Sequence, residues 1–141
     1  MADPKLYGGY PSKLPSDATP VSGSTATAIT TTTAVDVANF AAPGAGSRFY
    51  ITQALALNHT TGEPAMINIV DSAGKVYATI PAHNVVDAIA EGAPEPTRFE
   101  PPLRIDENVK LQGVGVEADL GDTFLTLNGF SGTTANEPSS V

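Results

Sequence analysis

Alternation of apolar and polar positions is the strongest pattern in this sequence, and it is clearest in RFYITQALALN, residues 48–58. Successive side chains of a β-strand point to opposite faces, so such an alternation predicts a strand with one buried face. One side of this strand carries Phe49, Ile51, Gln53, Leu55 and Leu57. The other side carries Tyr50, Thr52, Ala54 and Ala56.

Further short strands follow from the same period and from turn residues between them. AMINIVD and KVYATIP, residues 65–71 and 75–81, predict a hairpin closed by residues 72–74. The Thr- and Val-rich stretch 24–40 predicts one or two strands, and residues 121–130 predict the last one. Four prolines in residues 93–105 leave only edge strands there.

Two local irregularities are expected within this pattern. In VKLQGVGVEA, Val109 and Leu111 lie on one phase while Val114 and Val116 lie on the other, which predicts a β-bulge at Gly113. Residues 84–92 predict one short helix, capped at its start by Asn84 and ended by glycine.

The N-terminal residues 1–23 predict an extended arm. Prolines at positions 4, 11, 15 and 20 interrupt both helix and strand ladder. The arm nevertheless carries apolar side chains that no core of its own would bury: Leu6, Tyr7, Tyr10 and Leu14. We interpret these four as anchors for a partner's surface. The alternative is a disordered tail, which is common at chain ends.

Together these elements predict an all-β fold, a small antiparallel β-sandwich or jelly roll over residues 24–132. The extended arm, residues 1–23, precedes it and a polar tail, residues 133–141, follows it.

Composition narrows the function. Seven basic against 15 acidic residues give a net charge of -8, which argues against a nucleic-acid partner because phosphate binding needs clustered Lys and Arg. The sequence has no cysteine, which excludes disulfides and thiolate metal sites. No stretch approaches the roughly 20 apolar residues that cross a bilayer. The start, MADPKLYGGY, lacks the pattern of a signal peptide, so we expect synthesis in a cytoplasm and no membrane contact.

Few residues point to catalysis or to a bound cofactor. His59 and His83 are both expected in loops, without a metal-binding partner. The acidic residues Glu117, Asp119 and Asp122 could hold calcium, but a solvated turn explains them better.

A glycosidase would need two facing carboxylates, such as Asp106 and Asp122, and a small sandwich offers little cleft for them. We therefore expect no enzymatic activity, no metal and no cofactor.

The chain resembles the small β-sandwich decoration, or cement, proteins on the heads of tailed bacteriophages. The similarity covers residues 47–132. It rests on RFYITQALALN, the hairpin INIVDSAGKVYATI, FEPPLRI before ENVKLQGVGV, and a last strand ending in NGF. The resemblance implies a protein of the capsid surface, made in the host cytoplasm. It also implies trimers at capsid symmetry axes and an arm that grips capsid subunits or neighbouring copies.

The expected function is therefore stabilisation of an assembled phage head by bridging subunits of the major capsid protein. A homotrimer is also expected because a modest core without disulfides or metal gains from association. The alternative is a tail or host-attachment component that binds a receptor or a glycan through its loops.

Overall fold

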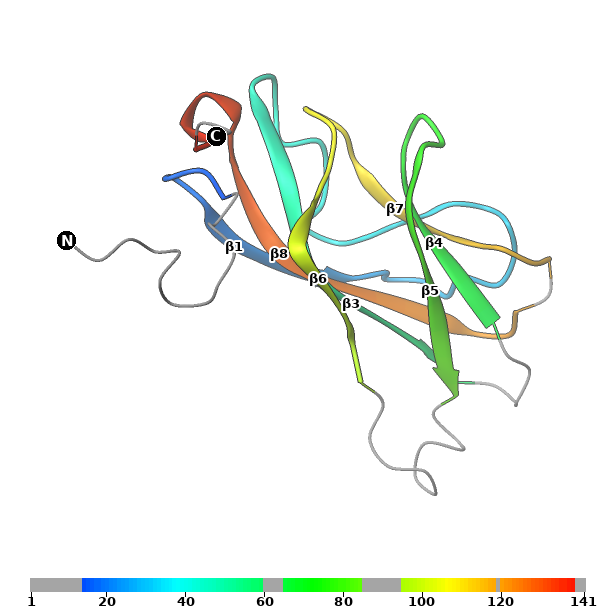
Figure 1. The fold of residues 1–141 in the computed structure, drawn as a ribbon. Helices are drawn as coiled ribbons and strands as arrows, with labels where there is room; N and C mark the ends of the chain where they lie inside the picture. Colours follow the sequence, from blue (N-terminus) through cyan, green and yellow to red (C-terminus); the bar gives the residue numbers. More distant parts are fainter. Residues whose placement is uncertain (1–13, 60–64, 85–94, 119, 139–141) are drawn as a thin grey trace.

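The computed structural model describes residues 14–59, 65–84, 95–118 and 120–138. The regular structure of these residues is almost entirely β (Figure 1). The elements are β1 Thr19–Ser24, β2 Val35–Asp36, β3 Ser47–Asn58, β4 Ala65–Asp71, β5 Val76–Asn84, β6 Thr97–Arg104, β7 Leu111–Gly115, β8 Thr123–Thr133 and the 3₁₀ turn η2 Thr134–Asn136.

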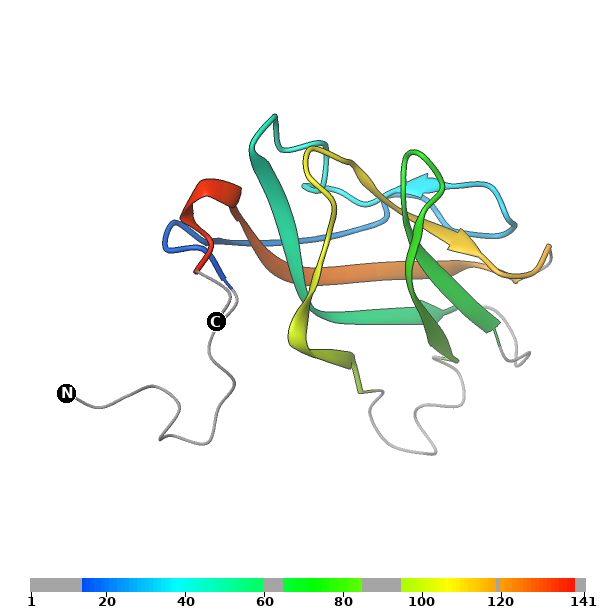
Figure 2. The same cartoon turned by 45° about the horizontal axis from the view of Figure 1, so that its top comes forward.

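The strands form one mixed sheet in the order β1-β8-β3-β5-β4-β7-β2, and β6 also pairs with β3. This sheet curls into a half-barrel around the core (Figures 1 and 2). The predicted all-β fold is confirmed, as is the β4–β5 hairpin. The arrangement differs from the expected antiparallel sandwich, since the strands share one sheet and β3 runs parallel to β5.

A bulge at Thr52 divides β3 into two halves of opposite phase. The pairing of β3 with both β6 and β8 shifts register between Ile51 and Gln53. Phe49 and Ile51 face the core before the bulge, and Tyr50 is buried on the other side of the strand, whereas the buried residues after the bulge are Ala54, Ala56 and Asn58. The single buried face expected from the alternation is therefore wrong, because an inserted residue turns the strand over. Figure 2 shows β3 bending sharply about midway.

Proline placement explains the irregular pairing of β6. Its residues Arg98 and Leu103 pair with Gln53 and Ile51 of β3, so β6 has several more residues than β3 between the same two pairs. Pro101 and Pro102 fall in this excess, where no ladder hydrogen bond is needed from a backbone N–H. The predicted edge character of this stretch is confirmed, because among the described strands β6 pairs with β3 alone.

Glycines on β7 lie where large neighbours fill the core. Gly113 and Gly115 are buried, and the β4–β7 register runs without interruption, so the predicted bulge at Gly113 is wrong. A Cβ on Gly113 would stand 2.5 Å from Ile29 Cδ1. Leu120 occupies the matching space at Gly115. Val114 and Val116 lie on the outward face of β7. The apolar pattern that indicated a phase change therefore comes from residues on the surface.

Residues 24–46 include β2 and bring it close to β1, so the two outermost strands of the sheet order lie near each other. Only β2 and two isolated bridges form here, Thr25 with Val37 and Ile29 with Thr123. The Ala38 N–H donates to Ser24 O at 3.0 Å, and Asn39 Nδ2 donates to Ser22 O at 2.9 Å. The outer edge of β1 is thereby occupied over these residues.

The curled sheet and residues 24–46 together enclose the hydrophobic core. Phe40 packs on Phe49 with ring centroids 4.9 Å apart. Around this pair lie the buried apolar side chains Ile29, Ile51, Ile67, Ile69, Ile80, Ile105, Leu111, Leu125 and Leu127. They come from every part of the curl, so the core depends on the whole sheet.

The boundaries of arm and tail need correction. Residues 19–23 belong to β1, which pairs with β8 along its whole length, so the prolines of the expected arm do not prevent a strand there. Pro20 is at the edge, where its missing N–H costs no ladder bond. At the other end, Thr133 closes β8 and residues 134–136 form η2. The predicted helix at 85–92 and arm residues 1–13 lie outside the described residues.

We predict that Gly113→Ala destabilises the fold by about 1–3 kcal/mol, because the new methyl group overpacks against Ile29 Cδ1. Ile29→Val removes that atom and by itself costs about 0.5–1.5 kcal/mol. The double variant should lose less stability than the sum of the two single losses. Urea unfolding of all four proteins measures this coupling, and strict additivity would contradict the predicted contact.

Truncation separates the two parts of the expected arm. A chain lacking residues 1–13 keeps every contact described above and should melt close to the full-length chain. A chain lacking residues 1–24 loses β1 and its packing against the core, and should lose about 2 kcal/mol or more. Thermal melts by circular dichroism test this, and equal stability of the two truncated chains would refute the role of β1.

Candidate functional site

The outward face of β5, β4 and β7 is the strongest candidate for a binding surface. Cross-strand pairing places Met66 beside Pro81 and Asn68 beside Thr79. Val116 continues the β7 register and donates its N–H to Met66 O at 3.1 Å. We call this surface the neutral face. It comprises Met66, Asn68, Val76, Thr79, Pro81, Gln112, Val114 and Val116.

Exposed large apolar side chains gather on the neutral face. Among the described residues, the exposed ones are Met66, Val76 and Val116, at 40, 50 and 45% exposure. All three belong to this one face. Isolated exposed apolar residues are ordinary, whereas a shared face rimmed by polar groups marks a contact surface.

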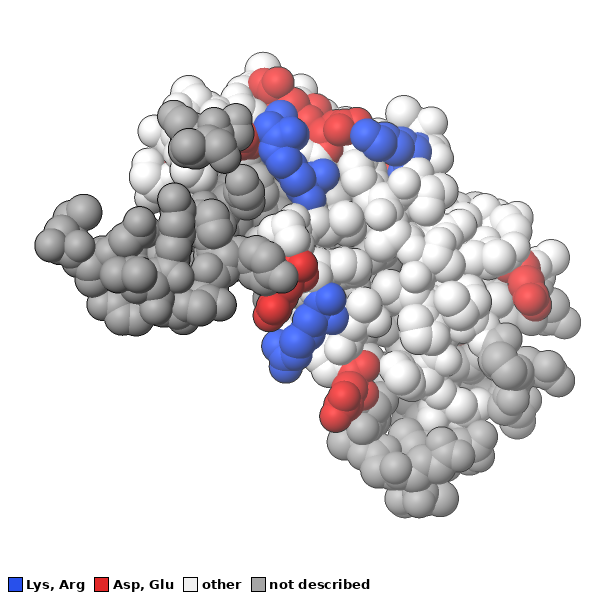
Figure 3. Space-filling model, in the orientation of Figure 1, with Lys and Arg blue, Asp and Glu red and all other residues white. Residues whose placement is uncertain are grey.

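Charge distribution singles out the same surface. None of its residues is charged, although the sequence carries a net charge of -8. Figure 3 shows the surface over β4 and β5 free of acidic and basic side chains, which lie toward its margins. At the β2 margin, Gln112 Nε2 donates to Asp36 Oδ1 at 2.8 Å, and Asp36 pairs with Lys110 at 3.2 Å. Depletion of charge with retained apolar area is typical of interface centres.

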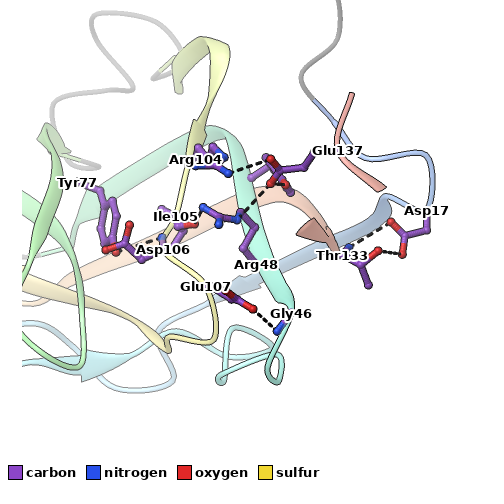
Figure 4. Close-up of polar contacts among 11 residues, drawn as sticks. Asp17, Gly46, Arg48, Tyr77, Arg104, Ile105, Asp106, Glu107, Thr133 and Glu137 are labelled. Carbon is purple, nitrogen blue, oxygen red and sulfur yellow. Dashed lines mark hydrogen bonds and ion pairs between the residues drawn. The ribbon is translucent and has the colours of Figure 1, made fainter. Parts of the chain in front are cut away.

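A second feature ties both ends of the described chain to the sheet. Glu137, just after η2, lies 3.2 Å from Arg48 Nε and 2.8 Å from Arg104 Nη2, and accepts a hydrogen bond from the Tyr50 hydroxyl. Figure 4 shows its carboxylate directed toward both arginines. We call Glu137, Arg48, Arg104 and Tyr50 the terminal clasp.

Residues next to the terminal clasp hold the base of the N-terminal arm in place. Thr133 donates its backbone N–H to Asp17 at 3.2 Å and its hydroxyl to the same carboxylate at 2.7 Å (Figure 4). Ser16 donates its N–H to Asn136 O at 3.0 Å. Pro15 is buried against Gly132. The chain before residue 14 therefore starts from a fixed point beside η2.

Electrostatics favour the ionised form of Glu137. Its burial acts to raise the pKa, but hydrogen bonds from Arg104 and Tyr50 and the charges of Arg104 and Arg48 outweigh it and hold the pKa below the ordinary value of 4.5. Burial and then the bond to Glu137 raise the pKa of Tyr50. The clasp is therefore a charged, hydrogen-bonded unit at neutral pH.

The predicted anchors are only partly within the described structure. Leu14 is half-buried at the arm base, whereas Leu6, Tyr7 and Tyr10 lie outside the described residues. Their role as anchors stays a prediction.

Residues considered for catalysis or metal binding are not brought together. His59 packs edge-on against Phe124 at 5.2 Å, and His83 lies within β5 instead of the expected loop. Asp106 pairs with Lys75 near the start of β3, while Asp122 precedes β8 at the other end of β3.

Within the described ranges, no three His, Asp or Glu side chains are placed to hold a metal ion. Asp119, part of the calcium hypothesis, lies outside these ranges. No helix within the described ranges is long and apolar enough to span a membrane.

Sequence reasoning missed the neutral face because the phase of Val114 and Val116 was interpreted as a β-bulge at Gly113. A signal was present, since Val114 and Val116 are apolar on the opposite phase from Leu111. The clasp had no comparable signal, because Arg48 and Glu137 are far apart in sequence. Comparison with known protein families, with curated proteins and with solved structures found no match.

We predict that Glu137→Gln destabilises the fold by about 1–2 kcal/mol at pH 7, since it removes charge-assisted bonds at a half-open site. The folded pKa is lowered, so the stabilisation is full above pH 4.5 and is lost as the pH falls through the lowered pKa. Denaturant titrations at several pH values measure the difference from the unaltered chain. Glu100→Gln, an exposed change of equal charge, serves as control. If the stability difference between Glu137→Gln and the unaltered chain persists at the lowest pH, the ionised carboxylate is not its origin.

Proposed function

We propose that this protein is a non-enzymatic structural virion component that decorates the head of a tailed bacteriophage and stabilises it by binding subunits of the major capsid protein. The observation that carries the proposal is the neutral face, which holds the exposed large apolar side chains of the described chain and no charged residue. The resemblance of residues 47–132 to head decoration proteins supports the choice of partner.

Two features favour attachment through several weak contacts. The neutral face has eight residues, fewer than the roughly 20–30 a side of a standard interface. The arm starts from a fixed base at residue 14, and 13 residues can extend about 40 Å. In the homotrimer that we propose, three faces and three arms would act together, and each later contact would become effectively intramolecular.

The proposed mechanism is linkage between binding and assembly. A protein that binds only the assembled shell, at about 100 times its dissociation constant, stabilises that shell by about 2.7 kcal/mol per site. The contacts are apolar and hydrogen-bonded, so occupancy should depend only moderately on salt. The effect is mechanical and thermal, with no turnover of a substrate.

Met66→Asp and Val116→Asp should each weaken binding to phage heads at least about tenfold, because each places an unpaired charge in an apolar contact. Co-sedimentation with heads stripped of the protein measures occupancy. Ala45→Asp adds the same charge to an exposed loop outside the neutral face and should bind normally. Unchanged occupancy of both face variants, with the fold intact, would refute this face as the contact.

Location and stabilisation test the function itself. Labelled protein should appear on the head in electron micrographs, and stripped particles should release their genome at a lower temperature than replete ones. Equal release temperatures at full occupancy would refute head stabilisation. Label on the tail would favour the host-attachment alternative instead.

A further inference from the structure

The outward side of β1, β8 and β3 carries a hollow that the proposed function does not use. Its volume is about 310 Å³, close to the lower limit for ligand pockets. The lining residues are Pro20, Val21, Ser22, Thr52, Asn128, Gly129 and Phe130. None of them belongs to the neutral face or to the terminal clasp.

Strand geometry builds this hollow. Phe130 pairs with Pro20 across β8 and β1, and Asn128 pairs with Ser22 one step further on the same face. The bulge at Thr52 forms the opposite wall, and the Thr52 hydroxyl donates to Asn128 O at 3.1 Å. The wall is fixed by the fold and does not depend on a loop.

The lining combines an aromatic surface with neutral hydrogen-bonding groups. Phe130 and Pro20 supply apolar surface at one end. The Asn128 amide and the Ser22 hydroxyl make no side-chain hydrogen bond to another described residue, and their positions leave them available to a ligand. An amide offers two donors and one acceptor, and a hydroxyl offers one donor and two acceptor positions.

We propose that this hollow binds a neutral sugar ring. The C–H face of a pyranose stacks on an aromatic ring, while its hydroxyls exchange hydrogen bonds with amide and hydroxyl groups such as those of Asn128 and Ser22. No charged side chain lines the hollow, which disfavours phosphate, carboxylate and metal ligands.

An extended peptide fits this place less well. Peptides that add to a sheet take main-chain hydrogen bonds from a free strand edge. Here β8 is paired on both sides, with β1 and with β3. The ligand must therefore bind through side chains on the face of the sheet, which suits a small ring with many hydroxyls.

Nuclear magnetic resonance titration of the full chain tests the proposal. The probes are glucose, galactose, mannose and N-acetylglucosamine, with maltose, lactose and chitobiose as two-ring forms. At least one probe should give saturable amide shifts confined to Ser22, Thr52 and residues 128–130. Asn128→Ala should weaken that binding about three- to tenfold, the effect of one neutral hydrogen bond. Phe130→Leu keeps the apolar volume but removes the ring, and should weaken binding further.

Asn68→Ala, the same change on the neutral face, should bind the sugar like the unaltered chain. No saturable shift with any probe at about 50 mM would overturn the proposal. A synthetic peptide of residues 4–14 provides a competing occupant. Shifts at the hollow with that peptide and not with sugars would overturn it as well, and would assign the hollow to another copy's arm. These results do not depend on capsid binding, so they are separable from the proposed function.

Discussion

The bulge at Thr52 is the constraint on which the rest of this structure depends. It turns β3 over between Ile51 and Gln53, so one strand serves the core with Phe49 at one end and with Ala56 at the other. Because β3 is paired with β8 along nearly its whole length, the bend passes to the neighbouring strand and the sheet curls. The bend of the sheet at β3 and the wall of the hollow at Thr52 both follow from this one inserted residue.

The curl also separates two chemically different outer surfaces. The neutral face lies over β5, β4 and β7, where apolar side chains point outward because Gly113 and Gly115 leave the inner space to Ile29 and Leu120. The surface over β1 and β8 instead combines Phe130 with serine, threonine and asparagine. The terminal clasp lies where the two ends of the described chain meet. One small sheet can thus present separate contacts without a second domain.

Local signals predicted much of the fold but little of the candidate site. The strand at 48–58 and the hairpin around residues 72–74 were predictable, since alternation and turn residues act over a few positions. The bulge was not, because Thr52 has no distinctive neighbour and its register is set by Asn128 on β8. Likewise, Val116 is as apolar as a core residue, and in the fold Leu120 fills the inner space at Gly115 while Val116 faces outward.

The edge of β1 has a consequence for how the protein behaves when many copies crowd together. An open strand edge is a template for pairing with another chain, which leads to filaments and aggregates. Here Pro20 has no N–H to offer, Asn39 occupies Ser22 O, and Ala38 occupies Ser24 O. Strand-to-strand growth is blocked at this edge, so any contact that copies make here is left to side chains, whose geometry is specific and whose number is finite.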